Sequence, residues 1–208
     1  MFGALAEDVL ARDSMTLYDA GVSRWLLSLA TEDSSEFFFA LTLLGSTWVI
    51  LPAGLLLGSW FAWRKQRLYL AALVLSVGGG SLLNLVLKNI FLRPRPDFAN
   101  AFYIESGYSF PSGHAMLSVL FYGMAAYLLA RGLTWKGQVR LGVTAFTLSL
   151  LIGFSRIFLG VHYLTDVLGG WAAGVVWLTV CVATVEGTQL LRSSPANLID
   201  FSSPPRSG

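Results

Sequence analysis

Long apolar stretches without a charge dominate the pattern along this chain. A helix that crosses a bilayer needs about 20 mostly apolar residues, and the longest stretch, residues 37–63, meets this length easily. The pattern predicts five membrane-spanning helices, over residues 37–63, 68–87, 115–130, 141–155 and 167–185. Two of them are short, and their polar flanks at His114 and Arg156 can extend them. We therefore predict an all-α, polytopic transmembrane helical bundle.

The first 36 residues follow a different pattern. The apolar residues on one helical face, at i, i+3, i+4 and i+7, are Val22, Trp25, Leu26 and Leu29. A segment of this kind is expected to lie in the membrane interface rather than cross the bilayer. It is acidic, and it lacks the basic start, apolar middle and cleavage site of a signal peptide. At the other end, residues 192–208 are rich in Ser and Pro and are expected to be disordered. We thus expect an N-terminal segment at 1–36, a membrane domain at 37–191 and a tail at 192–208.

The composition agrees with a membrane protein. Hydrophobic residues make up 55% of the chain and charged residues 12%, about half the charged share of a soluble domain. The net charge of +2 is small and its basic residues are scattered, which argues against a nucleic-acid binder. Cys181 is the single cysteine and lies in an apolar run, so it is expected to act as a small hydrophobic residue. An intrachain disulfide and a cysteine-based metal cluster are excluded.

Basic residues gather in alternate connections between the predicted spans. Those after the first, third and fifth spans are Arg64, Lys65, Arg67, Arg131, Lys136, Arg140 and Arg192. Positively charged connections tend to face the cytoplasm, so residues 88–114 and 156–166 are expected to share the opposite, exoplasmic side. Four basic residues on that side break this tendency, namely Lys88, Arg93, Arg95 and Arg156. Their presence there indicates another role.

Three short exoplasmic segments carry the residue types of a phosphate site. They are residues 88–96, 111–114 and 155–166. Without a metal, such a site needs fixed cations and backbone donors, and Lys88, Arg95 and Arg156 supply three cations. Gly113 allows close backbone approach. Ser112 precedes a helix N-terminus, where unpaired N–H groups and the helix dipole favour an anion.

The same segments contain both histidines of the chain, His114 and His162. His162 and Asp166 are four residues apart, so they are neighbours if a helix has begun there. A carboxylate on one ring nitrogen fixes the tautomer and leaves the other nitrogen to attack phosphorus. His114 can then protonate the leaving oxygen.

Each cluster has a simpler interpretation when it is taken alone. Lys88 and Arg95 could extend along the apolar surface to the interface, and a His–x3–Asp pair is often a structural hydrogen bond. A zinc site would have two histidines and one carboxylate, which falls short of usual catalytic zinc ligation, and three nearby cations oppose it. The gathering of all three segments on one membrane side favours the phosphate site.

Three other charged residues near the first motif give weaker signals. Asp97 and Glu105 could contact a head group, but a solvated loop position is favoured for both. Arg93, beside the motif, could add a phosphate contact or meet lipid head groups.

The three segments together resemble a known family signature. Residues 88–96 fit K-x6-R-P, residues 111–114 are P-S-G-H, and residues 155–166 fit S-R-x5-H-x3-D. This pattern is similar to that of the type 2 phosphatidic acid phosphatase superfamily, which includes lipid phosphate phosphatases, glucose-6-phosphatase and vanadium haloperoxidases. The resemblance implies a phosphohistidine on His162, oriented by Asp166, with His114 as general acid and no metal or other cofactor. The phosphate-binding residues that it implies are Lys88, Arg95, Ser112, Gly113 and Arg156.

Length and composition most resemble the small bacterial membrane members, which act on phosphatidylglycerophosphate, phosphatidic acid or undecaprenyl pyrophosphate. We therefore expect a lipid phosphatase in the bacterial plasma membrane, with its site facing the exterior and with lipid phosphates and membrane lipids as partners. Those members usually have six spans, so the first is missing here or replaced by residues 1–36. Alternatives are phosphoryl transfer to an acceptor other than water, and a scaffold or transporter with a retained phosphate pocket. A haloperoxidase fits less well, because those relatives are soluble.

Overall fold

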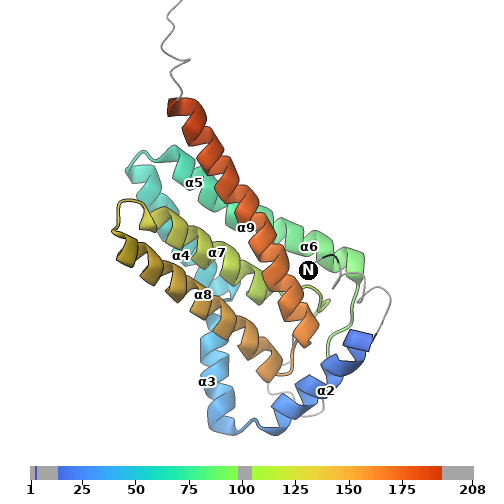
Figure 1. Cartoon of the computed structure of the whole chain (residues 1–208). Coiled ribbons are helices and arrows are strands. Elements are labelled where there is room, and N and C mark those ends of the chain that lie inside the picture. Colours follow the sequence, from blue (N-terminus) through green and yellow to red (C-terminus); the bar gives the residue numbers. More distant parts are fainter. Residues whose placement is uncertain (1–2, 4–13, 98–104, 194–208) are drawn as a thin grey trace, which may run out of the picture.

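The computed structural model describes residue 3, residues 14–97 and residues 105–193. Every regular element in this part of the chain is a helix (Figure 1). In chain order they are α2 (Ser14–Ser28), α3 (Glu32–Leu43), α4 (Thr47–Trp63), α5 (Arg67–Val74), the π-helical turn η1 (Leu75–Gly79), α6 (Gly80–Phe91), α7 (Gly113–Ala130), α8 (Trp135–Phe158) and α9 (Leu164–Ser193). The stretches that are long and apolar enough to cross a membrane are Glu32–Trp63, Arg67–Phe91, Gly113–Ala130, Trp135–Phe158 and Leu164–Ser193. The all-α bundle with five spans is confirmed.

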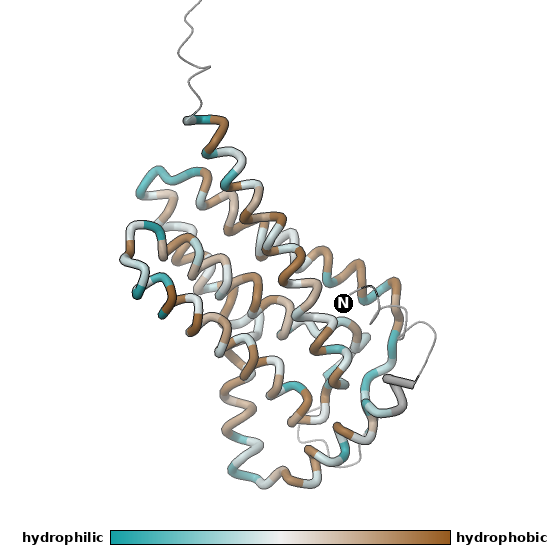
Figure 2. The backbone as a smooth tube through the Cα atoms, viewed as in Figure 1, coloured by the Kyte–Doolittle hydropathy of each residue, from teal (hydrophilic) through white to brown (hydrophobic). Residues whose placement is uncertain are grey.

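The two ends of the bundle carry different connections. The α4–α5 and α7–α8 connections and the C-terminal end of α9 lie at one end, whereas the α6–α7 and α8–α9 connections lie at the other, near α2 (Figure 1). The long helices are mostly hydrophobic, and hydrophilic positions gather towards the connections (Figure 2). Helix α7 packs against α8 and α9, with Met116, Leu120 and Met124 fully buried. Cys181 is buried in the same core, as expected for a small hydrophobic residue.

The first span is longer than predicted and is interrupted. It begins at Glu32 because Thr31 caps α3: its Oγ1 accepts a hydrogen bond from Ser34 N–H at 3.3 Å, and its own N–H donates to Ser34 Oγ at 2.8 Å. The predicted boundary at residues 36 and 37 therefore falls inside α3, since it rested on the last charge before the apolar run. Residues 44–46 then separate α3 from α4, and Tyr122 Oη donates to the freed Leu44 carbonyl at 2.8 Å.

The second span contains a π-helical turn between α5 and α6. Two hydrogen bonds tie this turn to neighbouring helices: Trp177 Nε1 of α9 donates to Leu75 O at 3.1 Å, and Ser76 Oγ of the turn donates to Leu120 O of α7 at the same distance. The turn ends at Gly79, where an added Cβ would lie 2.7 Å from the Trp177 ring. This turn precedes the helix that carries Lys88.

The expected N-terminal helix is present as α2 and packs against α8 and α9. Leu26 is buried against Ile157 and Val167, with Val22 beside it. Trp25 and Leu29, which were expected on the same apolar face, are exposed. At the other end of the chain, α9 includes Arg192 and Ser193, which were assigned to the tail, and residues 194–208 lie outside the described part.

Candidate active site

The three motif segments meet at one end of the bundle. The first follows α6, the second begins α7, and the third joins α8 to α9. Ser112 N–H donates to Asp166 O at 2.9 Å, which ties the start of α7 to the first turn of α9. This approach requires glycine at position 170, because a Cβ there would lie 2.6 Å from Ser112 O. The sequence prediction that the segments share one site is consistent with this arrangement.

His162 and Asp166 form the buried centre of the site. His162 Nδ1 lies 3.3 Å from Asp166 Oδ2, which also accepts a hydrogen bond from Tyr163 N–H at 2.9 Å. Helix α9 begins only at Leu164, so His162 belongs to the connection before it rather than to the same helix. The Tyr163 N–H holds the carboxylate back towards this connection, and the contact forms although the helix starts late.

The other nitrogen of His162 faces Arg95. Arg95 Nη1 lies 3.0 Å from His162 Nε2 and also donates to Val161 O at 3.0 Å. Because a guanidinium group can only donate, Nε2 must accept, so it has no proton and Nδ1 carries the proton towards Asp166. Burial lowers the pKa of His162 well below its ordinary value, and Arg156 and Arg95 lower it further. The imidazole is therefore neutral, and the electron pair on Nε2 accepts the hydrogen bond from Arg95, which must open before Nε2 can act as a nucleophile.

Arg156, from the last turn of α8, completes the cationic side of the site. Its side chain is 1% exposed, its Nη1 donates to Thr42 Oγ1 at 3.0 Å, and its Nη2 donates to Glu105 Oε2. The sequence motifs do not reveal Thr42, because it lies in an apolar helix more than one hundred residues away from Arg156. Burying an arginine is costly unless its donors are satisfied. The two partners hold Arg156 in place beside the nucleophile candidate.

Glu105 occupies the space that the site cations face. Its Oε2 accepts from both Arg95, at 3.1 Å, and Arg156, and it lies 4.0 Å from His162 Nε2. Burial would raise the pKa of Glu105, but Arg156 and Arg95 lower it by more. The solvated loop position favoured from the sequence is wrong for Glu105. Its carboxylate marks the place where these cations hold an anion.

Arg93 is also placed differently from either sequence expectation. Its Nη1 donates to Asp166 Oδ1 at 2.5 Å and to Thr165 Oγ1 at 2.7 Å, and its Nη2 donates to Asp19 Oδ2 at 2.7 Å. Burial opposes its charge, but Asp166 and Asp19 raise the pKa of Arg93. Its guanidinium group also covers the Tyr163 ring, 4.4 Å from the centroid. Arg93 therefore supports the His162–Asp166 pair from behind.

The remaining predicted residues surround the same space. Lys88 Nζ donates to Tyr108 O at 2.7 Å. Ser112 is fully buried, and its Oγ has no hydrogen-bond partner within the described ranges. At the start of α7, Gly113 lies close to Asn84, where a Cβ would be 3.2 Å from Asn84 Oδ1. The side chain of His114 is partly buried, and its electrostatic neighbours are Arg156, Arg95 and Lys88.

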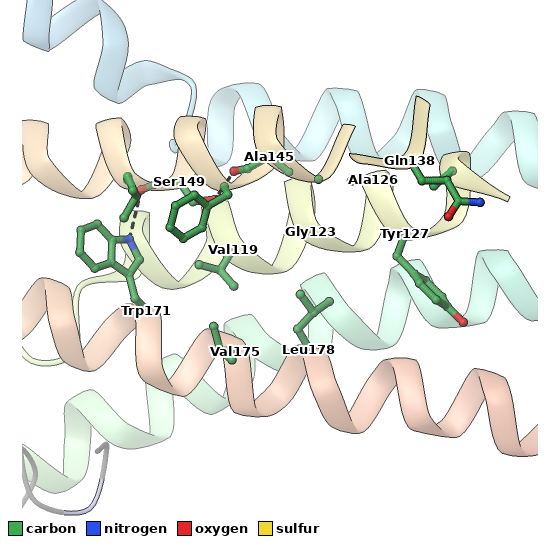
Figure 3. A pocket seen from close by; sticks show the side chains of 14 residues that line it. Val119, Gly123, Ala126, Tyr127, Gln138, Ala145, Ser149, Trp171, Val175 and Leu178 are labelled. Atoms are coloured by element: carbon green, nitrogen blue, oxygen red, sulfur yellow. Dashed lines mark hydrogen bonds between the residues drawn. The ribbon is translucent and has the colours of Figure 1, made fainter. Parts of the chain in front are cut away.

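An apolar pocket of about 460 Å³ lies elsewhere, between α7, α8 and α9 (Figure 3). Trp171 closes part of it and donates from Nε1 to Ser149 O at 3.1 Å. None of the predicted site residues lines this pocket. The polar cluster and this apolar pocket are therefore separate features of the bundle.

The chain is similar to known proteins in sequence and in fold. The family model of the PAP2 superfamily matches residues 69–189. The chain is 34% identical to phosphatidylglycerophosphatase B of Bacillus subtilis over 160 residues, which cover 76% of this chain and 78% of that protein. It is 30% identical to undecaprenyl-diphosphatase of Sulfolobus acidocaldarius over 149 residues, 69% of this chain and 66% of that protein. The crystal structure of a transmembrane PAP2 type phosphatidylglycerolphosphate phosphatase from Bacillus subtilis is similar with a TM-score of 0.79 at 30% identity, covering 97% of this chain and 95% of that one.

Proposed function

Because this chain belongs to the PAP2 superfamily, we propose that it is a membrane phosphatase that hydrolyses a lipid phosphomonoester or pyrophosphate through a phosphohistidine on His162. One observation carries the proposal: the unprotonated Nε2 of a buried, neutral His162 points at the space that Arg95 and Arg156 face. A neutral nitrogen beside two fixed cations is what attack on an anionic phosphoryl group requires. Asp166 holds the opposite nitrogen.

In the first step, Nε2 of His162 attacks phosphorus and the bond from phosphorus to the lipid oxygen breaks. His114, which must be in its protonated form for this step, gives its proton to the departing oxygen and becomes neutral. As the imidazole becomes positively charged, its Nδ1–H stays hydrogen-bonded to Asp166. Lys88, Arg95 and Arg156 stabilise the charge on the equatorial oxygens. Ser112 Oγ and the N-terminus of α7 can supply further donors.

In the second step, His114 accepts a proton from a water molecule, and the resulting hydroxide attacks phosphorus. The bond between phosphorus and Nε2 breaks, inorganic phosphate forms, and His162 returns to its neutral state. His114 has regained the proton that it gave to the leaving group, so the cycle closes. The phosphoryl oxygens would use the donors that Glu105 accepts from, so the carboxylate must move aside for each turnover.

The position of the site supports a lipid substrate at the exoplasmic face. It lies at the ends of the spans, where a lipid head group lies. The connections that carry Arg64, Lys65 and Arg131, and the start of α8 with Lys136, are at the opposite end of the bundle (Figure 1), and such positively charged ends tend to be cytoplasmic. The names of the relatives support phosphatidylglycerophosphate and undecaprenyl pyrophosphate as substrates, and phosphatidic acid is a third candidate.

A phosphate-release panel tests the proposal. The purified full chain in detergent is assayed with phosphatidylglycerophosphate, phosphatidic acid, undecaprenyl pyrophosphate and a soluble sugar phosphate. We expect the lipids to be preferred and His162→Ala to lower kcat by about 10⁴-fold or more. The control Asp97→Asn changes an exposed residue and should behave like the wild type. Near-normal activity of His162→Ala on a lipid phosphate would overturn the mechanism, and a phosphorylated acceptor in place of free phosphate would show a transferase.

A further inference from the structure

A buried row of alternating charges runs from His162 to the N-terminal helix. Asp166 contacts His162 with one oxygen and Arg93 with the other, and Arg93 bridges on to Asp19. The side chains of Asp166 and Asp19 are 0% and 1% exposed, and that of Arg93 is 10% exposed. These residues come from three separate parts of the chain. The family motifs specify His162 and Asp166, whereas Arg93 occupies an unspecified position of K-x6-R-P and Asp19 lies outside the motifs.

The second carboxylate changes what Arg93 does to Asp166. If Arg93 had Asp166 as its single anionic partner, the pair would be neutral, and the carboxylate would support a positive charge on His162 less well. Asp19 shares the guanidinium group, so Asp19, Arg93 and Asp166 together carry one net negative charge. In a buried environment this charge is weakly screened. It lies where His162 becomes positive during the reaction.

Asp19 also fixes the backbone next to Asp166. Its Oδ1 accepts from Thr165 N–H at 3.0 Å, and its Oδ2 accepts from the Thr165 hydroxyl. Thr165 is in the first turn of α9, whose N–H groups have no partner within the helix. Asp19 thus caps α9 from another helix. The packing of Val22 and Leu26 holds α2, and with it this carboxylate, in place.

We propose that Asp19 is a positioning residue for phosphoryl transfer, which acts through Arg93 on Asp166 and hence on the His162 nucleophile. This inference rests on the proposed role of His162. The N-terminal helix, assigned from the sequence to the membrane interface, then contributes to the chemistry. Asp19 stabilises the state in which His162 is bonded to phosphorus more than it stabilises phosphate bound by the cations alone.

Inhibition by two oxyanions can distinguish the state in which His162 is bonded to phosphorus from the state in which the cations alone bind phosphate. Vanadate can form a bond to Nε2 as an analogue of the transition state, whereas inorganic phosphate binds through the cations. We expect Asp19→Asn to lower kcat about tenfold with little change in KM, by analogy with the loss of an outer hydrogen-bond partner of a metal-ligating histidine. Vanadate inhibition should weaken by a similar factor, while phosphate inhibition should stay within about twofold. Asp33→Asn removes an exposed carboxylate near the same end of the chain and is the matched control.

A structural role for Asp19 would give a different result. Equal weakening of vanadate and phosphate inhibition together with a lower melting temperature would overturn the proposal, as would wild-type kcat and vanadate inhibition in Asp19→Asn. Asp19→Glu, which keeps the charge, should recover part of the loss. If Asp19→Asn does not fold, Arg93→Lys supplies the test: it keeps one charge but cannot bridge both carboxylates as a fork. If vanadate inhibits Arg93→Lys as strongly as it inhibits the wild type, Asp19 does not act on His162 through Arg93 and Asp166. An active His162→Ala would instead refute the proposed function.

Discussion

Replacing Glu105 with glutamine is expected to tighten the binding of inorganic phosphate. The Glu105 carboxylate accepts hydrogen bonds from Arg95 and Arg156, and phosphate in the proposed site would need the same two guanidinium groups. Burial raises the pKa of Glu105, but Arg156 and Arg95 lower it by more, so the carboxylate stays charged at neutral pH. It therefore competes with phosphate under assay conditions.

The size of this competition follows from the two contacts. A hydrogen bond to a charged group contributes about 1.5–3 kcal/mol, and Glu105 makes one to each arginine. The amide oxygen of glutamine is a neutral acceptor and keeps part of this hydrogen-bond energy. The Glu105 side chain is 24% exposed, so water reduces the energy difference between glutamate and glutamine further. A remaining difference of about 1.4 kcal/mol corresponds to tenfold in affinity. We expect the Kd of phosphate to fall by about this factor in Glu105→Gln.

Calorimetric titration of the purified full chain with phosphate, at fixed ionic strength, measures this Kd directly. Asp97→Asn is the matched control, because it removes the same charge from an exposed position in the same connection. Its Kd should stay within about twofold of the wild-type value, as is usual for surface substitutions. Equal affinity in Glu105→Gln and the wild type, or equal tightening in both variants, would refute competition at the arginines.

Two other substitutions test the support of the site. Asp166→Asn removes the carboxylate that accepts from His162 Nδ1, and kcat should fall by about 10³–10⁴-fold, as when the carboxylate of a catalytic triad is lost; steady-state phosphate release measures this, and a change in KM alone would contradict the role. Gly170→Ala would place a Cβ 2.6 Å from Ser112 O, so the free energy of unfolding should fall by about 1–3 kcal/mol in a thermal unfolding assay. Gly142→Ala, with open space around its Cβ, is the control, and equal stability of the two variants would argue against a close contact at position 170.

The spans and the motif segments could be predicted because each depends on residues that are near one another in sequence. Apolar length alone gave the five spans. Alternating basic connections then placed Lys88, His114 and His162 on one side, and the structure brings them to one end of the bundle. Asp166 was within reach of His162 by spacing, although the helix begins later than that argument assumed.

The supporting residues could not be found in this way, because they depend on how distant segments pack. Glu105 contacts Arg156 across 51 residues of chain, and Arg93 contacts Asp19 across 74. A local signal existed for Asp19. Asp19 shares one helical face, at i, i+3, i+4 and i+7, with Val22, Ser23 and Leu26. This half-polar face is the one that packs against the bundle. The interface prediction followed the more hydrophobic face, which exposes Trp25 and Leu29.

The π-helical turn in the second span sets how far α6 is rotated about the helix axis relative to α5. An α-helix advances about 100° per residue, and a π turn accommodates one extra residue without ending the helix. Residues after Leu75–Gly79 are therefore rotated by about that angle relative to an uninterrupted helix, and Lys88 follows within three turns. The half before the turn, α5, can thus vary its lipid-facing and packing surfaces independently of the direction in which Lys88 points. The one extra residue of the π turn thus sets the direction of this cation, and deleting it would rotate Lys88 away from the other cations while leaving the length of the span almost unchanged.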